Sequence, residues 1–155
     1  MRSTIFWATL VAGTLDILFA GIMSLVRGSE PGAMLRSVAS GPFPGASEWG
    51  AGGSALGLLT HFTLMAVMAA VFVLAARQRP ALIEKPIVWG VIYGLVTYVA
   101  MNLIVLPLRF GAPLPPPPRA IVAQLFAHIV LVGIPIALIA ARRLHPSPIR
   151  GRVSA

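Results

Sequence analysis

The sequence predicts an all-α membrane protein: a four-helix transmembrane bundle, up-down-up-down, with a short outer interfacial helix between the first two spans. Composition is the first reason, because 57% of the 155 residues are hydrophobic and only 10% are charged. A soluble domain carries about 25% charged residues. Four runs of about 20 mostly apolar residues are the second reason, since each is long enough to cross a bilayer. The third is the uneven distribution of Lys and Arg between the connections.

The four apolar runs predict four spanning helices, and proline or arginine follows each of them. The helices are expected over residues 4–26, 54–76, 86–108 and 120–141. Arg27 follows the first run, and Pro107 and Arg109 are expected to end the third. The first run, about 22 residues long, exceeds the 7–15 apolar residues of a signal peptide, so we expect a retained helix. Residues 1–145 then form one domain, and residues 146–155 form a basic cytoplasmic tail.

The connection between the first two spans contains a second kind of helix. Ser29-Glu30-Pro31 is typical of a helix start. Met34, Leu35, Val38 and Ala39 then form an apolar stripe, which predicts a short helix on the outer surface of the bilayer. The simpler interpretation is a connection that covers the helix ends, and the alternative is a lid over a cavity.

The basic residues predict the orientation and the partners of the chain. Eight of the twelve Lys and Arg residues fall on the side of the two termini, and four fall on the other side. The excess of basic residues on the cytoplasmic side predicts that both termini are cytoplasmic. The basic tail is attracted to anionic lipid, so the bilayer is the expected partner. Nucleic acid is not expected, because no nucleic-acid-binding module accompanies the charge.

Each predicted span carries one polar residue that is unusual at membrane depth. These candidates for binding a ligand or a proton are Asp16, His61, Asn102 and His128. Counted from the outer ends of the spans, their depths differ by about four residues, or roughly 6 Å of helix rise. The sequence therefore predicts one polar layer in the outer half of the membrane. Tyr98 and Gln124 lie one helical turn away from this layer on the third and fourth spans.

Asp16 makes this layer a functional hypothesis rather than a packing detail. An Asp near the centre of a spanning helix costs about 2.5–3.5 kcal/mol on insertion scales, and such residues mark functional sites by default. No Lys or Arg lies within the four runs. Asp16 is therefore expected either to be protonated or to pair with a protonated His61 or His128.

Three classes of function remain open for the layer. As a binding site, it holds a small ligand from the outer side, a haem between the two histidines, or a transition metal on His61, His128 and Asp16. As a transport-linked site, it passes or binds protons. As a set of polar contacts between helices, it stabilises a structural or assembly subunit. An enzyme is not expected, because Ser24 and Ser54 lie outside any nucleophile motif and the chain has no cysteine.

Small residues on the third span predict a helix contact. Gly90-x-x-x-Gly94 allows two helices to approach closely, and we expect it to serve a homodimer or a larger membrane complex. Pro135 is expected to kink the fourth span and to free a backbone carbonyl.

Several of these motifs occur together in one known group of proteins. They are Gly13-Thr14-Leu15-Asp16, Leu58-Leu59-Thr60-His61-Phe62, Tyr98-x-x-Met101-Asn102 with Pro107, and Ala127-His128 with Pro135. Over about residues 5–143 the chain resembles a group of small bacterial inner-membrane proteins of unknown function with four predicted helices. The resemblance implies the bacterial cytoplasmic membrane and the four-helix plan. It implies no activity, cofactor or substrate.

Overall fold

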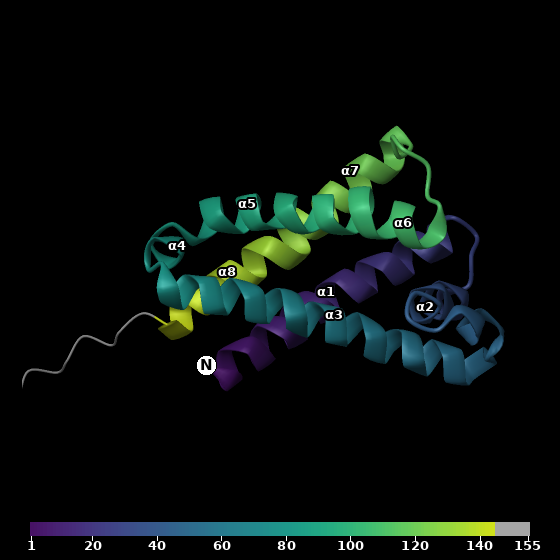
Figure 1. The fold of residues 1–155 in the computed structure, drawn as a ribbon, viewed down its shortest axis with the longest axis horizontal. Helices are drawn as coiled ribbons and strands as arrows, with labels where there is room; N and C mark the ends of the chain where they lie inside the picture. Colours follow the sequence, from purple (N-terminus) through teal and green to yellow (C-terminus); the bar gives the residue numbers. More distant parts are fainter. Residues whose placement is uncertain (145–155) are drawn as a thin grey trace, which may run out of the picture.

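The computed structural model describes residues 1–144, and every regular element among them is helical. Four helices are long and apolar enough to cross a membrane (Figure 1), namely Arg2–Val26, Gly50–Gln78, Pro86–Phe110 and Pro118–Leu144. Each contains one of the predicted spans whole. The prediction of an all-α chain with four long apolar helices is therefore confirmed. The predicted basic tail lies outside the described residues.

Two of the long helices are continuous but change their hydrogen-bond pattern. The third consists of α5 (Pro86–Tyr98), the π-helical η2 (Val99–Val105) and α6 (Leu106–Phe110). The fourth consists of α7 (Pro118–Phe126), the π-helical η3 (Ala127–Gly133) and α8 (Ile134–Leu144).

Each π segment ends two residues before a proline, Pro107 or Pro135. Proline lacks an N–H and clashes with the carbonyl four residues earlier, and a wider turn relieves both problems. The third helix passes Pro107 and ends at Phe110, directly after Arg109 and two residues beyond the predicted span. Gly111 follows as its C-cap, and its φ of 62° is the left-handed conformation that favours glycine.

The short helix predicted between the first two spans is α2 (Pro31–Ala39), which is followed by the 3-10 turn η1 (Pro44–Glu48). It packs across α3 (Gly50–Gln78), and a side chain at Gly57 would overlap the backbone carbonyl of Leu35 at this crossing. The Ser54 hydroxyl donates to the Gly32 carbonyl at 3.0 Å, which further ties α2 to the start of α3. We call this the cap end of the molecule.

The opposite end, which we call the terminal end, holds the start of α1 (Arg2–Val26) and the ends of α3 and α8. Arg143 in α8 donates to the Ser3 hydroxyl at 2.9 Å, and Arg77 in α3 donates to the Met1 sulfur at 2.9 Å. The short helix α4 (Ala81–Glu84) joins α3 to α5 at this end. Residues far apart in the sequence are thus brought together around the N-terminus.

Glycines allow the third and fourth helices to pack backbone against backbone. Gly90 and Gly94 of α5 lie directly against Gly133 and its neighbours, where a side chain on any of the three would overlap backbone atoms. The Gly90-x-x-x-Gly94 face is therefore filled by the same chain. This corrects its predicted use as a contact with another copy or subunit.

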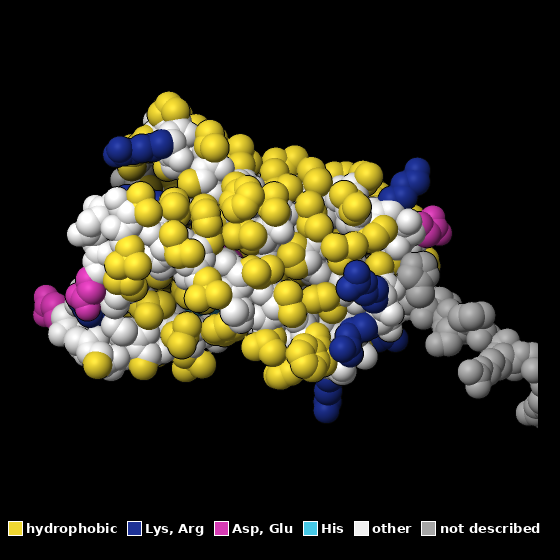
Figure 2. All heavy atoms as spheres, turned by 180° about the vertical axis from the view of Figure 1, so that it is seen from behind, with side chains coloured by type: hydrophobic (Ala, Val, Ile, Leu, Met, Phe, Trp, Pro, Cys, Tyr) yellow, Lys and Arg dark blue, Asp and Glu magenta, His cyan; other side chains and the backbone are white. Residues whose placement is uncertain are grey.

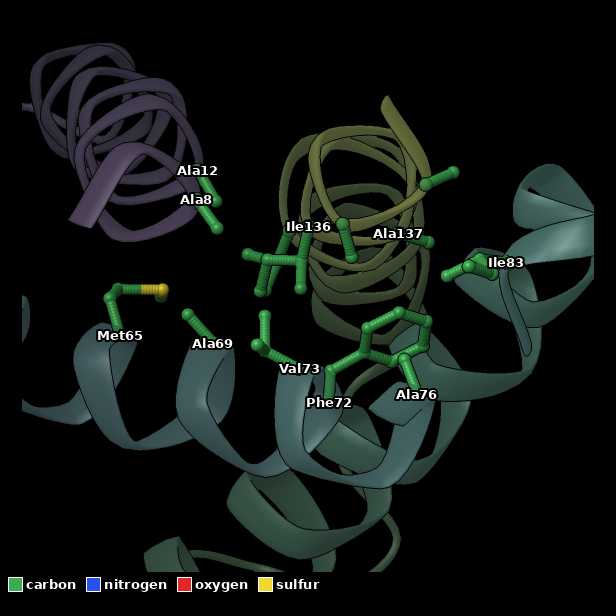
Figure 3. Packing of buried hydrophobic residues seen from close by; sticks show 13 residues of the cluster. Ala8, Ala12, Met65, Ala69, Phe72, Val73, Ala76, Ile83, Ile136 and Ala137 are labelled. Atoms are coloured by element: carbon green, nitrogen blue, oxygen red, sulfur yellow. The ribbon is translucent and has the colours of Figure 1, made fainter. Parts of the chain in front are cut away.

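The apolar core lies in the half of the molecule that ends at the termini. Figure 3 shows Ala8 and Ala12 of α1 facing Ala69 of α3 and Ile136 of α8, and the small alanine side chains let the helices approach closely. Val73 and Ile136 are fully buried between them. The half near the cap end contains the four residues of the predicted polar layer and the two cavities described below.

The surface between the two ends is apolar. Figure 2 shows hydrophobic side chains over the middle of the molecule, with Lys and Arg toward the ends. Large apolar side chains such as Leu59 and Val122 are 65% and 70% exposed. Soluble monomers rarely expose contiguous apolar patches of this extent, whereas lipid covers them in a membrane. With the four long helices, this surface defines a multi-pass membrane protein.

Candidate functional site

The four predicted site residues all lie in the interior of the half near the cap end. Asp16 comes from α1, His61 from α3, Asn102 from η2 and His128 from η3. His61, Asn102 and His128 are buried, and the Asp16 side chain is 18% exposed. Both π segments therefore coincide with a polar residue of the layer. π-helical turns occur often at functional sites, and the sequence alone did not predict these two segments.

Asp16 and His61 form the closest pair in this layer. The His61 Nε2–H donates to the Gly13 carbonyl, with nitrogen and oxygen 2.9 Å apart. This bond directs His61 Nδ1 toward the Asp16 Oδ2, at 3.9 Å. Gly13 makes the approach of α3 feasible, because a Cβ there would lie 2.7 Å from the Phe62 ring.

The hydrogen bond to Gly13 determines which atoms can exchange a proton. Since His61 Nε2 keeps its proton for the carbonyl, His61 can gain a proton only on Nδ1. A proton bound by this pair would lie either on the Asp16 carboxyl, beside a neutral imidazole, or on His61 Nδ1, which gives an ion pair. Without that proton, an ionised carboxylate would face an imidazole lone pair in an apolar interior, which is costly.

His128 lies within electrostatic range of Asp16 but has its own partners. Its Nδ1–H donates to the Gln124 carbonyl at 3.0 Å. Its ring meets Tyr98 edge to face, with ring centroids 6.0 Å apart. Tyr98 and Gln124, which the sequence places one turn from the layer, are thus both neighbours of His128. These contacts fix the ring and leave Nε2 as the atom that can change its protonation.

Asn102 is the least satisfied member of the layer. The residue is 8% exposed, and its Nδ2 has no hydrogen-bond partner among the described residues. Leaving a buried donor unpaired costs about 1–3 kcal/mol. Such an amide group is therefore available to a water molecule or a ligand that reaches the layer.

The predicted metal ligands do not converge. Within residues 1–144, no three His, Asp or Glu side chains are grouped so that they could hold a metal ion. His61 Nε2 is engaged by Gly13, and His128 Nδ1 is engaged by Gln124. Coordination of a metal or a haem iron by His61 Nε2 would require the bond to Gly13 to break. The metal and haem hypotheses therefore stay predictions of the sequence.

An open cavity of about 400 Å³ runs along α1 from Arg27 near the cap end to Asp16. Arg27 and Asp16 are eleven residues apart on the same face of the helix, about 16 Å of rise. Ser37 of α2 and Gln124 of α7 line the opposite walls. Ala33, Met34 and Ser37 of α2 form part of the wall of this cavity, so the first connection borders it as well as packing on the start of α3.

Comparison with protein-family models, with curated proteins and with solved structures gives no match to this chain. The resemblance to small bacterial inner-membrane proteins therefore stays a prediction. The function has to be inferred from the chemistry of the site itself, within a multi-pass membrane protein.

Proposed function

We propose that this chain is a proton-binding membrane protein in which Asp16 and His61 together take up one proton. The observation that carries the proposal is the geometry of the pair. His61 Nδ1 lies 3.9 Å from the Asp16 carboxyl while Nε2 is held by Gly13, and Asp16 lines the cavity under α2. A buried acid paired with a histidine and reached by a cavity that is lined in part by polar side chains is suited to reversible protonation.

The proposal includes an orientation. The chain forms an up-down-up-down bundle in the bacterial inner membrane, with both termini in the cytoplasm, and the cap end faces the outer side. The excess of Lys and Arg around the termini supports this orientation. The proton then reaches Asp16 from outside the cell, along α1 and beneath α2.

Binding of the proton is favoured over its conduction through the molecule. On the terminal side of Asp16, fully buried Ala8, Ala12 and Val73 fill the space between α1, α3 and α8. Such packing places mainly apolar side chains on that side of Asp16, and the only buried polar groups described in this part of α1 are the hydroxyls of Thr4 and Thr9, which do not titrate. The pair therefore acts as a protonation switch that is loaded and emptied from the cap end.

One labelling experiment tests the pair directly, because Asp16 is the sole Asp in the sequence. Protein carrying ¹³C-carboxyl aspartate, in lipid nanodiscs, gives one Asp carboxyl signal by NMR, and ¹⁵N-histidine reports the His61 ring. We expect both signals to titrate together as a single one-proton event. The Asp16 midpoint should move in His61→Gln and should move much less in the matched control His128→Gln.

Two results would contradict the proposal. If the Asp16 signal responds equally to His61→Gln and His128→Gln, the two residues do not share a proton. If Asp16 and His61 titrate independently, the pair is only a structural contact between helices. The hydrogen bond from His61 to Gly13 then stabilises the contact, and the Asp16 carboxyl does not contribute to it.

Access to Asp16 is tested separately through the cavity wall, because the chain has no cysteine. Ser24→Cys places a thiol on the cavity wall, and Thr4→Cys places one at a buried position near the terminal end. A membrane-impermeant thiol reagent added outside should label Ser24→Cys and leave Thr4→Cys unmodified. Failure to label Ser24→Cys, with Arg27→Cys labelled as the positive control, would contradict the route.

A further inference from the structure

A second hollow, separate from the Asp16 cavity, lies between α3 and the η2–α6 part of the third helix. Its volume is about 880 Å³, more than twice that of the cavity at Asp16. We propose that this groove binds one anionic phospholipid, with an acyl chain in the groove and the phosphate at Arg109. This inference does not depend on the proton-binding function.

The walls of the groove are chemically apolar. Its sides are formed mainly by aliphatic and aromatic side chains, including Leu56, Leu59, Leu64, Met101, Val105 and Phe110. Four hydroxyl residues also line it, Ser37, Ser40, Thr60 and Thr63. Ser37, Ser40 and Thr63 each donate to a backbone carbonyl three or four residues earlier, at 2.9, 2.7 and 2.8 Å. A hydrocarbon chain therefore suits this surface better than a polar solute.

The groove has the length that one lipid chain needs. The α5–α6 helix and α3 diverge toward the cap end (Figure 1), while the Tyr93 hydroxyl donates to the Met68 carbonyl at 2.7 Å nearer the terminal end. Leu56 to Leu64 spans eight residues, about 12 Å of helix rise. One leaflet of hydrocarbon is about 15 Å deep, half of a bilayer core. The groove thus covers most of one leaflet.

Arg109 supplies a cationic group where the groove reaches the cap end. Its Nε and Nη2 donate to the carbonyls of Gly41 and Ser40, both at 2.7 Å, and its guanidinium lies over the Phe110 ring. A guanidinium carries five N–H donors, so three remain. Among the described residues, no carboxylate lies within salt-bridge distance of Arg109. A phosphate is the acceptor that arginine matches best.

The occupant follows from combining these two features. One unpaired cation at the level of the headgroups and a long apolar wall below it define an amphiphile with one anionic group. Phospholipid is the molecule of that class that surrounds any membrane protein. Since Arg109 holds the residues that follow α2, a lipid bound there also stabilises the cap over Asp16.

Lipid binding is measured by native mass spectrometry and by thermal unfolding of the detergent-solubilised protein. The probes are phosphatidylglycerol and phosphatidylcholine with identical chains. We expect wild type to retain one phosphatidylglycerol and to gain stability from it. Arg109→Gln should weaken its binding about tenfold, the loss expected for one charge-assisted contact. The control Arg119→Gln, an exposed arginine outside the groove, should bind as wild type.

A second pair of variants tests the groove while keeping Arg109. Leu59→Trp fills the groove from an exposed position, and Leu58→Trp adds the same side chain next to it without lining the groove. Phosphatidylglycerol should be lost from Leu59→Trp alone. Equal binding of both lipids, equal effects of Arg109→Gln and Arg119→Gln, or equal stabilisation by glycerophosphoglycerol without acyl chains would each overturn the proposal.

Discussion

The contact between the third and fourth helices makes Gly94→Ala a sensitive test of the packing. A Cβ at Gly94 would lie 2.5 Å from the His128 carbonyl oxygen and 2.6 Å from the Ile129 Cα. Ordinary contacts of a Cβ begin at 3.4 Å. The helices must therefore separate by about 0.9 Å, because both opposing atoms belong to backbone and cannot rotate away.

Two opposing terms set the size of the effect. Overpacking of this kind costs about 1–3 kcal/mol. Alanine favours a helix over glycine by about 0.5–1 kcal/mol. The expected net loss against wild type is about 0–2.5 kcal/mol in the free energy of unfolding, and against a variant that gains only the helix preference it is about 1–3 kcal/mol. Gly21→Ala is the matched control, since no heavy atom lies within 4 Å of its added Cβ and it receives only the favourable term.

The assay is reversible unfolding of both variants in mixed micelles of mild detergent and SDS. We expect Gly94→Ala to be less stable than wild type, and Gly21→Ala to be equally or more stable. The displaced His128 carbonyl lies in the same π segment as the His128 ring, so the ¹⁵N signals of this ring should shift in Gly94→Ala only. Equal stability of the two variants would refute the backbone contact between the helices.

The remaining predictions concern single contacts. Tyr93→Phe removes the 2.7 Å bond to the Met68 carbonyl and keeps the ring against Phe72, so it should cost about 0.6 kcal/mol, the average for such bonds in membranes. Tyr98→Phe leaves that bond intact and serves as its comparison. Gly57→Ala should cost about 1–3 kcal/mol, because its Cβ overlaps the Leu35 carbonyl and lifts α2 from α3. It should also accelerate thiol labelling of Ser24→Cys, whereas Gly52→Ala, with open space around it, should do neither.

The long helices could be predicted because run length and apolar content are local properties of the sequence. The start of α2 was equally local, since Pro31 occupies its first turn. The π segments, in contrast, could not be predicted from the local sequence. Pro107 and Pro135 indicate that a regular helix is interrupted, but whether the chain ends, kinks or widens depends on the helix packed against it. At Pro107 the helix widens and continues.

Within the polar layer, the sequence offered both His61 and His128 as partners of Asp16 but could not choose between them. The depth of a residue in the membrane can be estimated from its position along its span. This estimate places Asp16 and His61 at the same level. The orientation of each imidazole ring is set by its hydrogen bond to a backbone carbonyl, that of Gly13 for His61 and that of Gln124 for His128. For the same reason, the sequence could identify Gly90 and Gly94 as a contact face but not the helix that fills it.

The two halves of the molecule have opposite packing, and this difference determines where a change of protonation would act. Small side chains such as Ala12 and Ala69 close the half near the termini, where the helices have no room to move without loss of contact. The half near the cap end contains the Asp16 cavity, both π segments and the unpaired Asn102 amide. A charge that forms or vanishes on Asp16 and His61 therefore meets a packed core on one side and a cavity wall formed by α2 on the other. α2 is held on α3 by the Gly57 crossing and the Ser54 hydroxyl, and Arg109 binds the carbonyls of Ser40 and Gly41 that follow it. Under the proposed function, a response of α2 to protonation of the pair should therefore be detected as a change in these particular contacts.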